Sequence, residues 1–335
     1  MRIKDKIYGS FKIEEPVLLA LLKSPTLKRL KGINNGGWYP AEKSVRNSPS
    51  RYEHSVGVFL LLRRYGAPLK EQIAGLLHDA SHSAFSHTID YIVSQNETDT
   101  ASQGHQDKVH VHFLENSEIK TILEEHGFTL EEITDEKKYP LLEQPLPALC
   151  ADRIDYFLRT FPQMYSYKIA KKRWAYFLEH LIVADGVFAF DNPDVALFFA
   201  KLFNWTDEHF WSSFVSAVMF GYGGLMFKKV LSKGYLKEED FYTFSDKDII
   251  KKVKKVKEIK VYLKALNEKA VLHQGKDIPV VCKVRSIDPL VVTKGVKTQV
   301  SKLFPSYASE LKKRGKTKKH LLKDPAKKNL QMEEK

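Results

Sequence analysis

Histidines and aspartates with the spacing of a metal site gather in one stretch of the sequence, residues 51–90. The segment RYEHSVGVFLLLRRYGAPLKEQIAGLLHDASHSAFSHTID holds four histidines and two aspartates. Arg51 and His54 are three residues apart, and His78 and His82 are four apart, which predicts that this second pair shares one helix face. Apolar runs surround these side chains, and bare imidazoles are costly in such surroundings unless they are paired or bind a metal. The cluster therefore predicts a buried metal site rather than ordinary core histidines.

A fourth ligand for this site comes from later in the chain. Asp152 lies in ALCADRIDYF, another helical segment flanked by apolar residues. Together with His54 and the adjacent pair His78 and Asp79, it gives two nitrogen and two oxygen ligands. Such a mixed set suits a divalent transition metal (Mn, Fe, Co, Ni or Zn) better than calcium.

The chemistry that this set permits is phosphate-bond hydrolysis. A bound divalent ion lowers the pKa of its water and polarises a phosphoryl oxygen, and Mg²⁺ on the substrate phosphates is compatible with the same chemistry. Histidines beyond the ligand set can serve as a general acid or bind phosphate. Arg51 and Arg153 flank ligand positions, and arginine neutralises phosphate bidentately. The reaction class favoured is hydrolysis of phosphoester or phosphoanhydride bonds.

The elements that must position these residues are mostly helical. The segment PVLLALLKSPTLKRL predicts a helix that is interrupted at Pro25, and residues 51–92 predict two or three helices. In ALCADRIDYFLRTF, Asp152, Asp155 and Arg159 fall on about one helix face. The aromatic stretch from Asp194 to Met226 has the periodicity of core helices.

The C-terminal third changes in character. From Asp277 the sequence alternates and is rich in valine, which predicts two or three antiparallel strands. Ahead of it, SDKDIIKKVKKVKEIKVYLK predicts one amphipathic helix with a lysine-rich face. We therefore expect a mainly α-helical core over residues 1–230, a mixed α+β region over 231–310, and a disordered basic tail over 311–335.

Composition narrows the class further. The chain has 335 residues, of which 43% are hydrophobic, and a formal net charge of +13. No run of 18 apolar residues and no signal-like N-terminus occur, so we expect no membrane partner. Cys150 and Cys282 give no disulfide framework, which favours a reduced, cytoplasmic location. The basic C-terminal region is either a solvated face with a solubilising tail or a weak contact for nucleic acid.

At this point the ordered motifs resemble a known family, the HD-domain metal-dependent phosphohydrolases. Within it, the chain is most similar to the deoxynucleoside triphosphate triphosphohydrolases of the SAMHD type. The likeness is carried by RYEHSVGV, LLHDASHSAFSH, GHQD and ADRIDYFLR, and spans roughly residues 5–300. It implies an HD-domain helical core with a small α+β C-terminal part, a nucleotide substrate and assembly into homo-oligomers.

The resemblance also implies a role for each matching position. The metal ligands are His54, His78, Asp79 and Asp152. The catalytic group is His105, with His82 and Asp90 in support. The substrate-binding residues are Arg51, His87 and Arg153 for phosphate and Tyr156 for the sugar pocket. Three alternatives stay open: His105 as a surface histidine, Tyr156 as a core residue, and Arg51 as a partner of Glu53 or of a nearby carboxylate.

Several positions depart from the family pattern. Ser81 and Ser83 stand near the ligand pair where glycine is common, and Gln106 replaces a glutamate. Thr160 occupies the place of the aspartate that holds the sugar 3′-hydroxyl, and Ile33-Asn34 replace the Gln-Leu pair under the deoxyribose. These departures leave hydrolysis as the expectation and leave the sugar open. The predicted function is a metal-dependent nucleotide phosphohydrolase, most similar to a dNTP triphosphohydrolase. The alternatives are a phosphatase or phosphodiesterase of another nucleotide, and a nucleic-acid-binding module with a structural metal.

Overall fold

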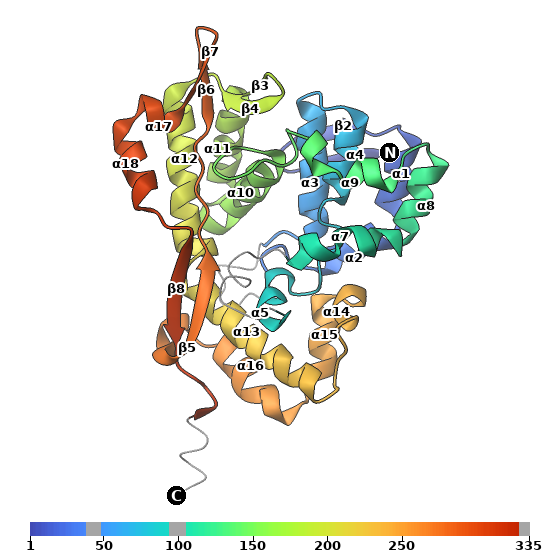
Figure 1. Cartoon of the computed structure of the whole chain (residues 1–335), viewed down its shortest axis with the longest axis vertical. Coiled ribbons are helices and arrows are strands. Elements are labelled where there is room, and N and C mark those ends of the chain that lie inside the picture. Colours follow the sequence, from blue (N-terminus) through green and yellow to red (C-terminus); the bar gives the residue numbers. More distant parts are fainter. Residues whose placement is uncertain (38–47, 94–104, 328–335) are drawn as a thin grey trace, which may run out of the picture.

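The computed structural model describes residues 1–37, 48–93 and 105–327, and it is mostly helical (Figure 1). The helices of the first half of the chain pack mainly against one another. They are α1 (Pro16–Lys23), α2 (Pro25–Arg29), α3 (Arg51–Arg64), α4 (Leu69–Leu77), α5 (Asp90–Val93), α7 (His105–Glu115), α8 (Glu118–Glu125), α9 (Leu130–Thr134), α10 (Ala151–Met164) and α11 (Tyr167–His180).

The helices of the second half follow a short hairpin. They are α12 (Pro193–Thr206), α13 (Phe214–Ser232), α14 (Asp240–Thr243), α15 (Asp246–Val253), α16 (Lys260–Leu266), α17 (Val300–Leu303) and α18 (Pro305–Lys313). Single turns of 3-10 or π-helix join several of them: η1 (Leu30–Gly32), η3 (Ser86–Thr88), η4 (Glu136–Lys138), η5 (Asp207–Trp211), η6 (Lys257–Ile259) and η7 (Ala270–His273).

The strands form three small sheets. They are β1 (Arg2–Asp5), β2 (Gly9–Lys12), β3 (Leu181–Ala184), β4 (Val187–Phe190), β5 (Gln274–Lys283), β6 (Leu290–Thr293), β7 (Val296–Gln299) and β8 (Thr317–Leu322). β1 and β2 form an N-terminal hairpin, and β3-β4-β6-β7 form a four-stranded sheet in which β6 runs parallel to β4. β5 pairs with β8 in antiparallel register, with Lys283 opposite Thr317.

The start of α3 is fixed by its cap. The Ser50 hydroxyl accepts a hydrogen bond from the backbone N–H of Glu53, and the Glu53 carboxylate accepts one from the N–H of Ser50. This reciprocal capping box satisfies two N–H groups that the first turn of a helix leaves open. Arg51 and His54 therefore sit in the first turn of a helix whose entry is firmly set.

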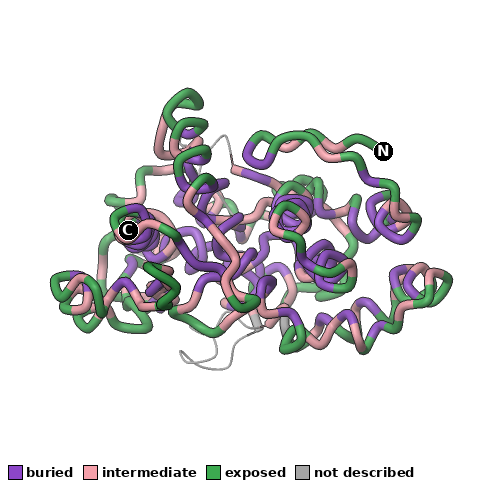
Figure 2. The backbone as a smooth tube through the Cα atoms, turned by 90° about the horizontal axis from the view of Figure 1, so that it is seen from above, coloured by how far each residue is buried: buried purple, intermediate pink, exposed green. Residues whose placement is uncertain are grey.

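Two apolar cores hold the chain together. The first joins α1 to α4, α8 to α12, and Ile287, Val291, Val300 and Tyr307 of the C-terminal region. The second joins α13, α15, α16, β5 and β8 with residues 84–89, which follow the histidine cluster. Figure 2 shows buried residues (purple) along the inner sides of the helices and exposed ones (green) at the outer turns. The loop that carries His87 is thus anchored in a core built by the last third of the chain.

The helix α13 forms the centre of this second core. Among the described helices it alone has the length and apolarity of a membrane-spanning segment. Two thirds of that apolar window is buried inside the protein, 67%. Its burial against α5, α16 and β5 accounts for its apolar character.

Several sequence-based expectations differ from the fold. The expected disordered tail over 311–335 is ordered through residue 327, because α18 extends to Lys313 and β8 pairs with β5. The single amphipathic helix is broken into α15 and α16 by a turn at residues 254–256. The expected division at residue 230 also differs, because α13 belongs to the second core while residues 287–307 return to the first.

Candidate active site

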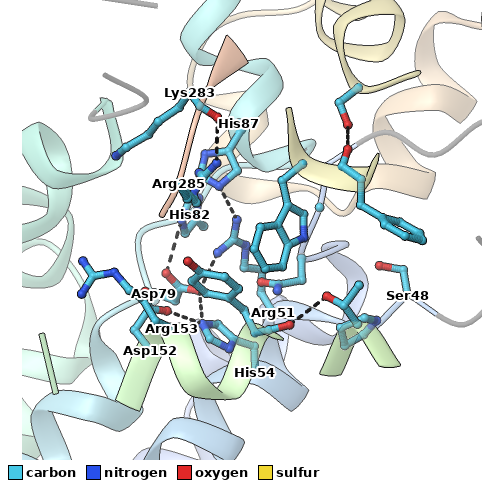
Figure 3. A pocket seen from close by; sticks show the side chains of 18 of the residues that line it. Ser48, Arg51, His54, Asp79, His82, His87, Asp152, Arg153, Lys283 and Arg285 are labelled. Atoms are coloured by element: carbon cyan, nitrogen blue, oxygen red, sulfur yellow. Dashed lines mark hydrogen bonds and ion pairs between the residues drawn. The ribbon is translucent and has the colours of Figure 1, made fainter. Parts of the chain in front are cut away.

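Four predicted ligands come together from three places in the chain, and Figure 3 shows His54, Asp79 and Asp152 of this set close to one another. His54 comes from α3, Asp152 from α10, and His78 and Asp79 from the turn after α4. The Nε2 atom of His54 lies 3.3 Å from His78 Nε2, 2.9 Å from Asp152 Oδ1 and 3.6 Å from Asp79 Oδ2. His78 Nε2 lies 3.6 Å from Asp152 Oδ1 and 3.5 Å from Asp79 Oδ1. One donor atom each of His54, His78 and Asp152 therefore lie within 4.8 Å of one another, and Asp79 approaches the two imidazoles with different oxygens.

The hydrogen bonds behind the two imidazoles show that this donor set fits a divalent ion. His78 Nδ1 lies 2.8 Å from the carbonyl oxygen of Gly75, which can only accept, so Nδ1 carries the proton. His54 Nδ1 is held in the same way by Asp155 Oδ2 at 2.7 Å. When both rings are neutral, as metal ligation requires, each turns a lone pair on Nε2 toward the other ring and toward two carboxylates. A cation removes that repulsion, and a carboxylate behind a ligating imidazole is the usual support of a metal site.

The electrostatics of the protein alone also favour a cation at this point. Although burial opposes its charge, Asp79 and Asp152 raise the pKa of His78 to about 10. Despite burial, Arg51 and the neighbouring histidines hold the pKa of Asp79 well below its usual range. The carboxylates are therefore ionised and attract positive charge. A divalent ion would displace protons from this cluster on binding.

The turn after α4 differs from the expected helix face. The helix ends at Leu77, so His78 and His82 do not stack one helical turn apart. Instead, the N–H of Ala80 donates to Leu77 O and that of His82 to Asp79 O, which winds the chain tightly around the carboxylate of Asp79. Both His78 Nε2 and His82 Nε2 face Asp79 Oδ1, at 3.5 and 3.3 Å.

A buried charge network supports the site from behind. Asp155 accepts from Arg159 Nε at 2.7 Å, and Arg159 Nη2 donates to Asp5 at 2.8 Å. Both Asp155 and Arg159 are almost completely buried. Gly57 of α3 makes room for them, because a Cβ there would lie 1.9 Å from Arg159 Nη2 and 2.1 Å from Asp155 Oδ1. The spacing Asp152-x-x-Asp155 in the sequence is the signal from which this support could have been inferred.

The ligand set opens into a cavity of about 550 Å³. This volume lies in the range of small-molecule sites. Its walls combine the ligand residues with charged and aromatic side chains from both cores, among them Arg51, His82, His87, Glu143, Arg153, Tyr156, Thr160, Trp211, Phe220, Lys283 and Arg285. Sequence reasoning did not place Trp211, Lys283 or Arg285 here, because no local pattern connects them with ligands more than fifty residues away.

Arg51 pairs with a nearby carboxylate, as its alternative interpretation allowed, and that carboxylate is Asp79 rather than Glu53. Its Nη1 donates to Asp79 Oδ2 at 2.7 Å and its Nε donates to Ser86 Oγ at 3.0 Å. Its Nη2 lies 3.3 Å from His87 Nε2. Arg51 thus connects a metal ligand with the loop that carries His87, and it faces the cavity.

Arg153 and Tyr156 both line the cavity. They differ in how far their polar or aromatic groups are already engaged by other protein groups. Arg153 is committed to the protein, since its Nη2 donates to Glu143 at 2.6 Å and its Nη1 to the carbonyl of Ala148 at 3.0 Å. The ring of Tyr156 packs edge-on against Trp211, with centroids 5.0 Å apart. Thr160 donates its hydroxyl to the backbone oxygen of Tyr156 at 2.9 Å and also faces the cavity.

The two candidate catalytic histidines lie in different surroundings. His82 lines the cavity, and burial together with Arg51 lowers its pKa to about 3, so its ring is neutral at pH 7. His105 does not line the cavity. Its Nε2 lies 2.5 Å from the hydroxyl of Tyr242 in α14, and its N–H donates to Asp90. Asp90 in turn lies 3.6 Å from Nδ1 of His87.

Comparison with known proteins places this geometry in a family. The HD domain profile matches residues 51–160, which contain all four ligands. The chain is 30% identical over 320 residues to the metal-dependent phosphohydrolase cns2 of Cordyceps militaris, covering 92% of this chain and 90% of that protein. It is 44% identical over 207 residues to the uncharacterized protein YdhJ of Bacillus subtilis, covering 61% and 60% of the two chains.

Similarity to nucleotide-cleaving relatives is more restricted. The human deoxynucleoside triphosphate triphosphohydrolase SAMHD1 is 29% identical over 150 residues, which are 39% of this chain and 23% of that protein.

Among solved structures, a hypothetical protein from Aquifex aeolicus has a TM-score of 0.66 at 18% identity, covering 95% and 94% of the two chains. A phosphohydrolase from Bacteroides thetaiotaomicron has a TM-score of 0.64 at 17% identity, covering 96% and 99%. These two structures share the fold. With the near full-length relationship to the Cordyceps militaris enzyme and the assembled ligand set, they lead to one conclusion. The chain belongs to the HD-domain metal-dependent phosphohydrolases.

Proposed function

We propose that this phosphohydrolase acts on a nucleotide, and that its substrate is a deoxynucleoside triphosphate cleaved to deoxynucleoside and triphosphate. The observation that carries the proposal is the position of the ligand set in the wall of a cavity of about 550 Å³ with cationic and aromatic walls. The aromatic pair Tyr156 and Trp211 offers ring surface for a sugar or base, and Arg51 offers charge for phosphate. The partial similarity to SAMHD1 supports the same substrate class.

The residues of the chain have separable tasks in such a reaction. His54, His78, Asp79 and Asp152 would hold a divalent ion, which supplies Lewis acidity toward a phosphoryl oxygen and activation of water when bound. Arg51 orients Asp79 and brings positive charge to the cavity wall. His82 is the imidazole placed to exchange a proton with the reacting groups, because it lines the cavity and is neutral at pH 7. His105 and Asp90 hold the loop behind it.

A second candidate within the same chemistry is a phosphatase or phosphodiesterase for another nucleotide. The observation that favours it is Thr160, which stands in the cavity with its hydroxyl proton directed to the backbone of Tyr156. A hydroxyl oriented in this way offers the sugar an uncharged acceptor, weaker than a carboxylate. Selection for one sugar over another would then be weak.

Product analysis with a nucleotide panel tests the proposal. The protein is stripped with a chelator, reloaded with Mn, Fe, Co, Ni or Zn, and incubated with deoxynucleoside triphosphates, ribonucleoside triphosphates, monophosphates and cyclic nucleotides. Deoxynucleoside plus intact triphosphate is the expected result, and its absence from the Asp79→Ala protein is the control. Release of orthophosphate or of a monophosphate instead would contradict the proposed substrate and would still identify the protein as a phosphohydrolase.

We also propose a cytoplasmic location and a weak nucleic-acid contact through the basic C-terminal region, both from composition, and a homo-oligomeric state, from the family resemblance. The lysines of α15 in that region offer a test. Lys251 and Lys252 are exposed on that helix. Charge reversal of both, measured by binding of single-stranded DNA at two salt concentrations, is the suitable test. Removal of the C-terminal segment is not, because it would delete β8 from its sheet with β5.

A further inference from the structure

We propose that Lys283 and Arg285 form a phosphate subsite that recognises a polyphosphate tail, and that the C-terminal region thereby supplies part of substrate recognition. Both residues line the cavity that contains the ligand set. Figure 3 shows them beside His87 and away from His54 and Asp152. The inference rests on the phosphohydrolase assignment and does not depend on which nucleoside the substrate carries.

The backbone around Arg285 is rigidly held by a buried ion pair. Asp207 in η5 accepts a hydrogen bond from the N–H of Arg285 at 3.0 Å. The guanidinium of Arg314 donates to Asp207 at 2.8 Å, and also to the carbonyl of Arg285 at 3.3 Å and the hydroxyl of Ser286 at 2.8 Å. Asp207 is completely buried. Three elements far apart in sequence therefore converge on the backbone of one cavity-facing arginine.

The residues that follow are fixed just as closely. The N–H of Asp288 donates to the carbonyl of Pro147 at 2.8 Å, and the Tyr307 hydroxyl donates to the carbonyl of Ile287. On the other side, Lys283 ends strand β5, where it pairs with Thr317 of β8. The loop is therefore already fixed before a ligand arrives. Because binding does not have to order it, a charged ligand loses less entropy and binds more strongly.

The loop adds positive charge to a cavity wall that already contains Arg51 and Arg153. Arg51 is engaged with Asp79, and Arg153 is engaged with Glu143. Lys283 and Arg285 bring further positive charge to the side of the cavity where His87 lies. Burial first, and then the charges of Arg51 and Arg285, lower the pKa of His87, so this ring stays a neutral hydrogen-bonding group. Arg285 Nη1 lies 3.5 Å from the carbonyl oxygen of Lys283, and both side chains line the cavity. An arginine fork and a lysine ammonium on one cavity wall match the charge of linked phosphates.

This arrangement predicts discrimination by phosphate number. A single phosphate can occupy either the metal end of the cavity or the Lys283 and Arg285 end. A chain of three phosphates can engage both ends at once, so its binding energy depends on both. Loss of the subsite therefore weakens binding of tripolyphosphate more than binding of orthophosphate.

The experiment measures binding of inorganic tripolyphosphate and orthophosphate to the full-length protein, reloaded with Mn²⁺, by calorimetry. Arg285→Gln is compared with the wild type and with Lys276→Gln, an equal charge loss at an exposed position of the same strand β5. We expect Arg285→Gln to raise the Kd for tripolyphosphate by about 10- to 100-fold, the effect of losing a charge-assisted bidentate contact. Lys276→Gln should change it less than about threefold, in line with a solvated surface charge.

The binding constants test the subsite directly, without a measurement of turnover. An unchanged Kd in Arg285→Gln, or an equal loss in Lys276→Gln, overturns it. Lys283→Gln is measured in parallel, so that the comparison survives if Arg285→Gln does not fold. Tripolyphosphate binding that depends on Arg285, in a protein that cleaves no nucleotide of the panel, refutes the proposed function alone. If the protein hydrolyses a nucleotide but the Kd for tripolyphosphate is the same in Arg285→Gln and in the wild type, the subsite alone is refuted.

Discussion

Replacement of Gly57 by alanine tests how tightly the metal ligands are supported. In an ordinary helix interior this change is stabilising by about 1 kcal/mol, because alanine is the better helix former. Gly57 lies in the middle of α3, so helix propensity alone predicts a more stable protein. The structure predicts the opposite, because the new Cβ would lie 1.9 Å from Arg159 Nη2 and 2.1 Å from Asp155 Oδ1.

The expected loss of stability depends on how easily the Arg159 side chain can move away from the new Cβ. The end of an arginine side chain usually moves at little cost, but this one is buried and bonded to both Asp155 and Asp5. Separating one partner from a buried ion pair costs about 3–5 kcal/mol. After the helix propensity is subtracted, Gly57→Ala should lower the free energy of unfolding by about 2–4 kcal/mol. Because Asp155 also holds Nδ1 of His54, metal affinity should fall by about 10- to 100-fold.

Two measurements check this prediction. Denaturant unfolding gives the change in stability, and competition with a chromophoric chelator gives the metal affinity. Ser55→Ala on the same helix is the matched control, since Ser55 is fully buried and its hydroxyl has no hydrogen-bond partner among the described residues. It should be neutral in both assays. A Gly57→Ala protein as stable as the wild type, with equal metal affinity, would refute the reasoning.

Three further predictions concern the ligands, the histidines and the second core. Asp79→Ala should not retain a divalent ion after reloading, and one full equivalent by elemental analysis would remove Asp79 from the ligand set. His82→Ala should lower kcat by about 10²- to 10⁴-fold, the usual contribution of a general acid or base, and His105→Ala by less, because only His82 lines the cavity. The reverse order in steady-state assays would mean that His105 enters the cavity during turnover. Burial raises the pKa of Asp246 to about 6, so its ionised form is disfavoured in the folded protein. The free energy of unfolding should therefore fall as pH rises from about 4 to about 6, by up to about 3 kcal/mol, and this slope should be absent from urea titrations of Asp246→Asn.

The convergence of His54, His78, Asp79 and Asp152 was predictable because the signals of these residues are local. His54, the pair His78 and Asp79, and Asp152 each stand out as polar residues inside apolar segments, where only pairing or a metal makes them tolerable. Their order along the chain then identified the family. The helix face expected for His78 and His82 failed because α4 ends at Leu77. Periodicity does not show where a helix stops when small residues such as Ala80 and Ser81 follow.

The other wall of the cavity was not predictable from local pattern. Lys283 and Arg285 read as ordinary basic residues at the end of a strand, and only the tertiary fold brings them opposite His87. Strand β8 was missed for a related reason. Its sequence TKKHLL carries lysines on an edge strand, as soluble sheets commonly do, and this resembles a solvated tail. Pairing with β5 decides the structure there, and pairing is a nonlocal property.

The anchoring of the loop around His87 in the second core has a consequence for the time at which the enzyme becomes active. All four predicted metal ligands have been synthesised once residue 152 is made. The core that anchors residues 84–89 is completed only by Leu322 of β8, roughly 170 residues later. At about 5–20 residues per second, that interval lasts roughly 10–35 s. The first core, too, is completed only by Tyr307, so the ligand cluster and the loop that carries His87 both reach their final packing near the end of synthesis.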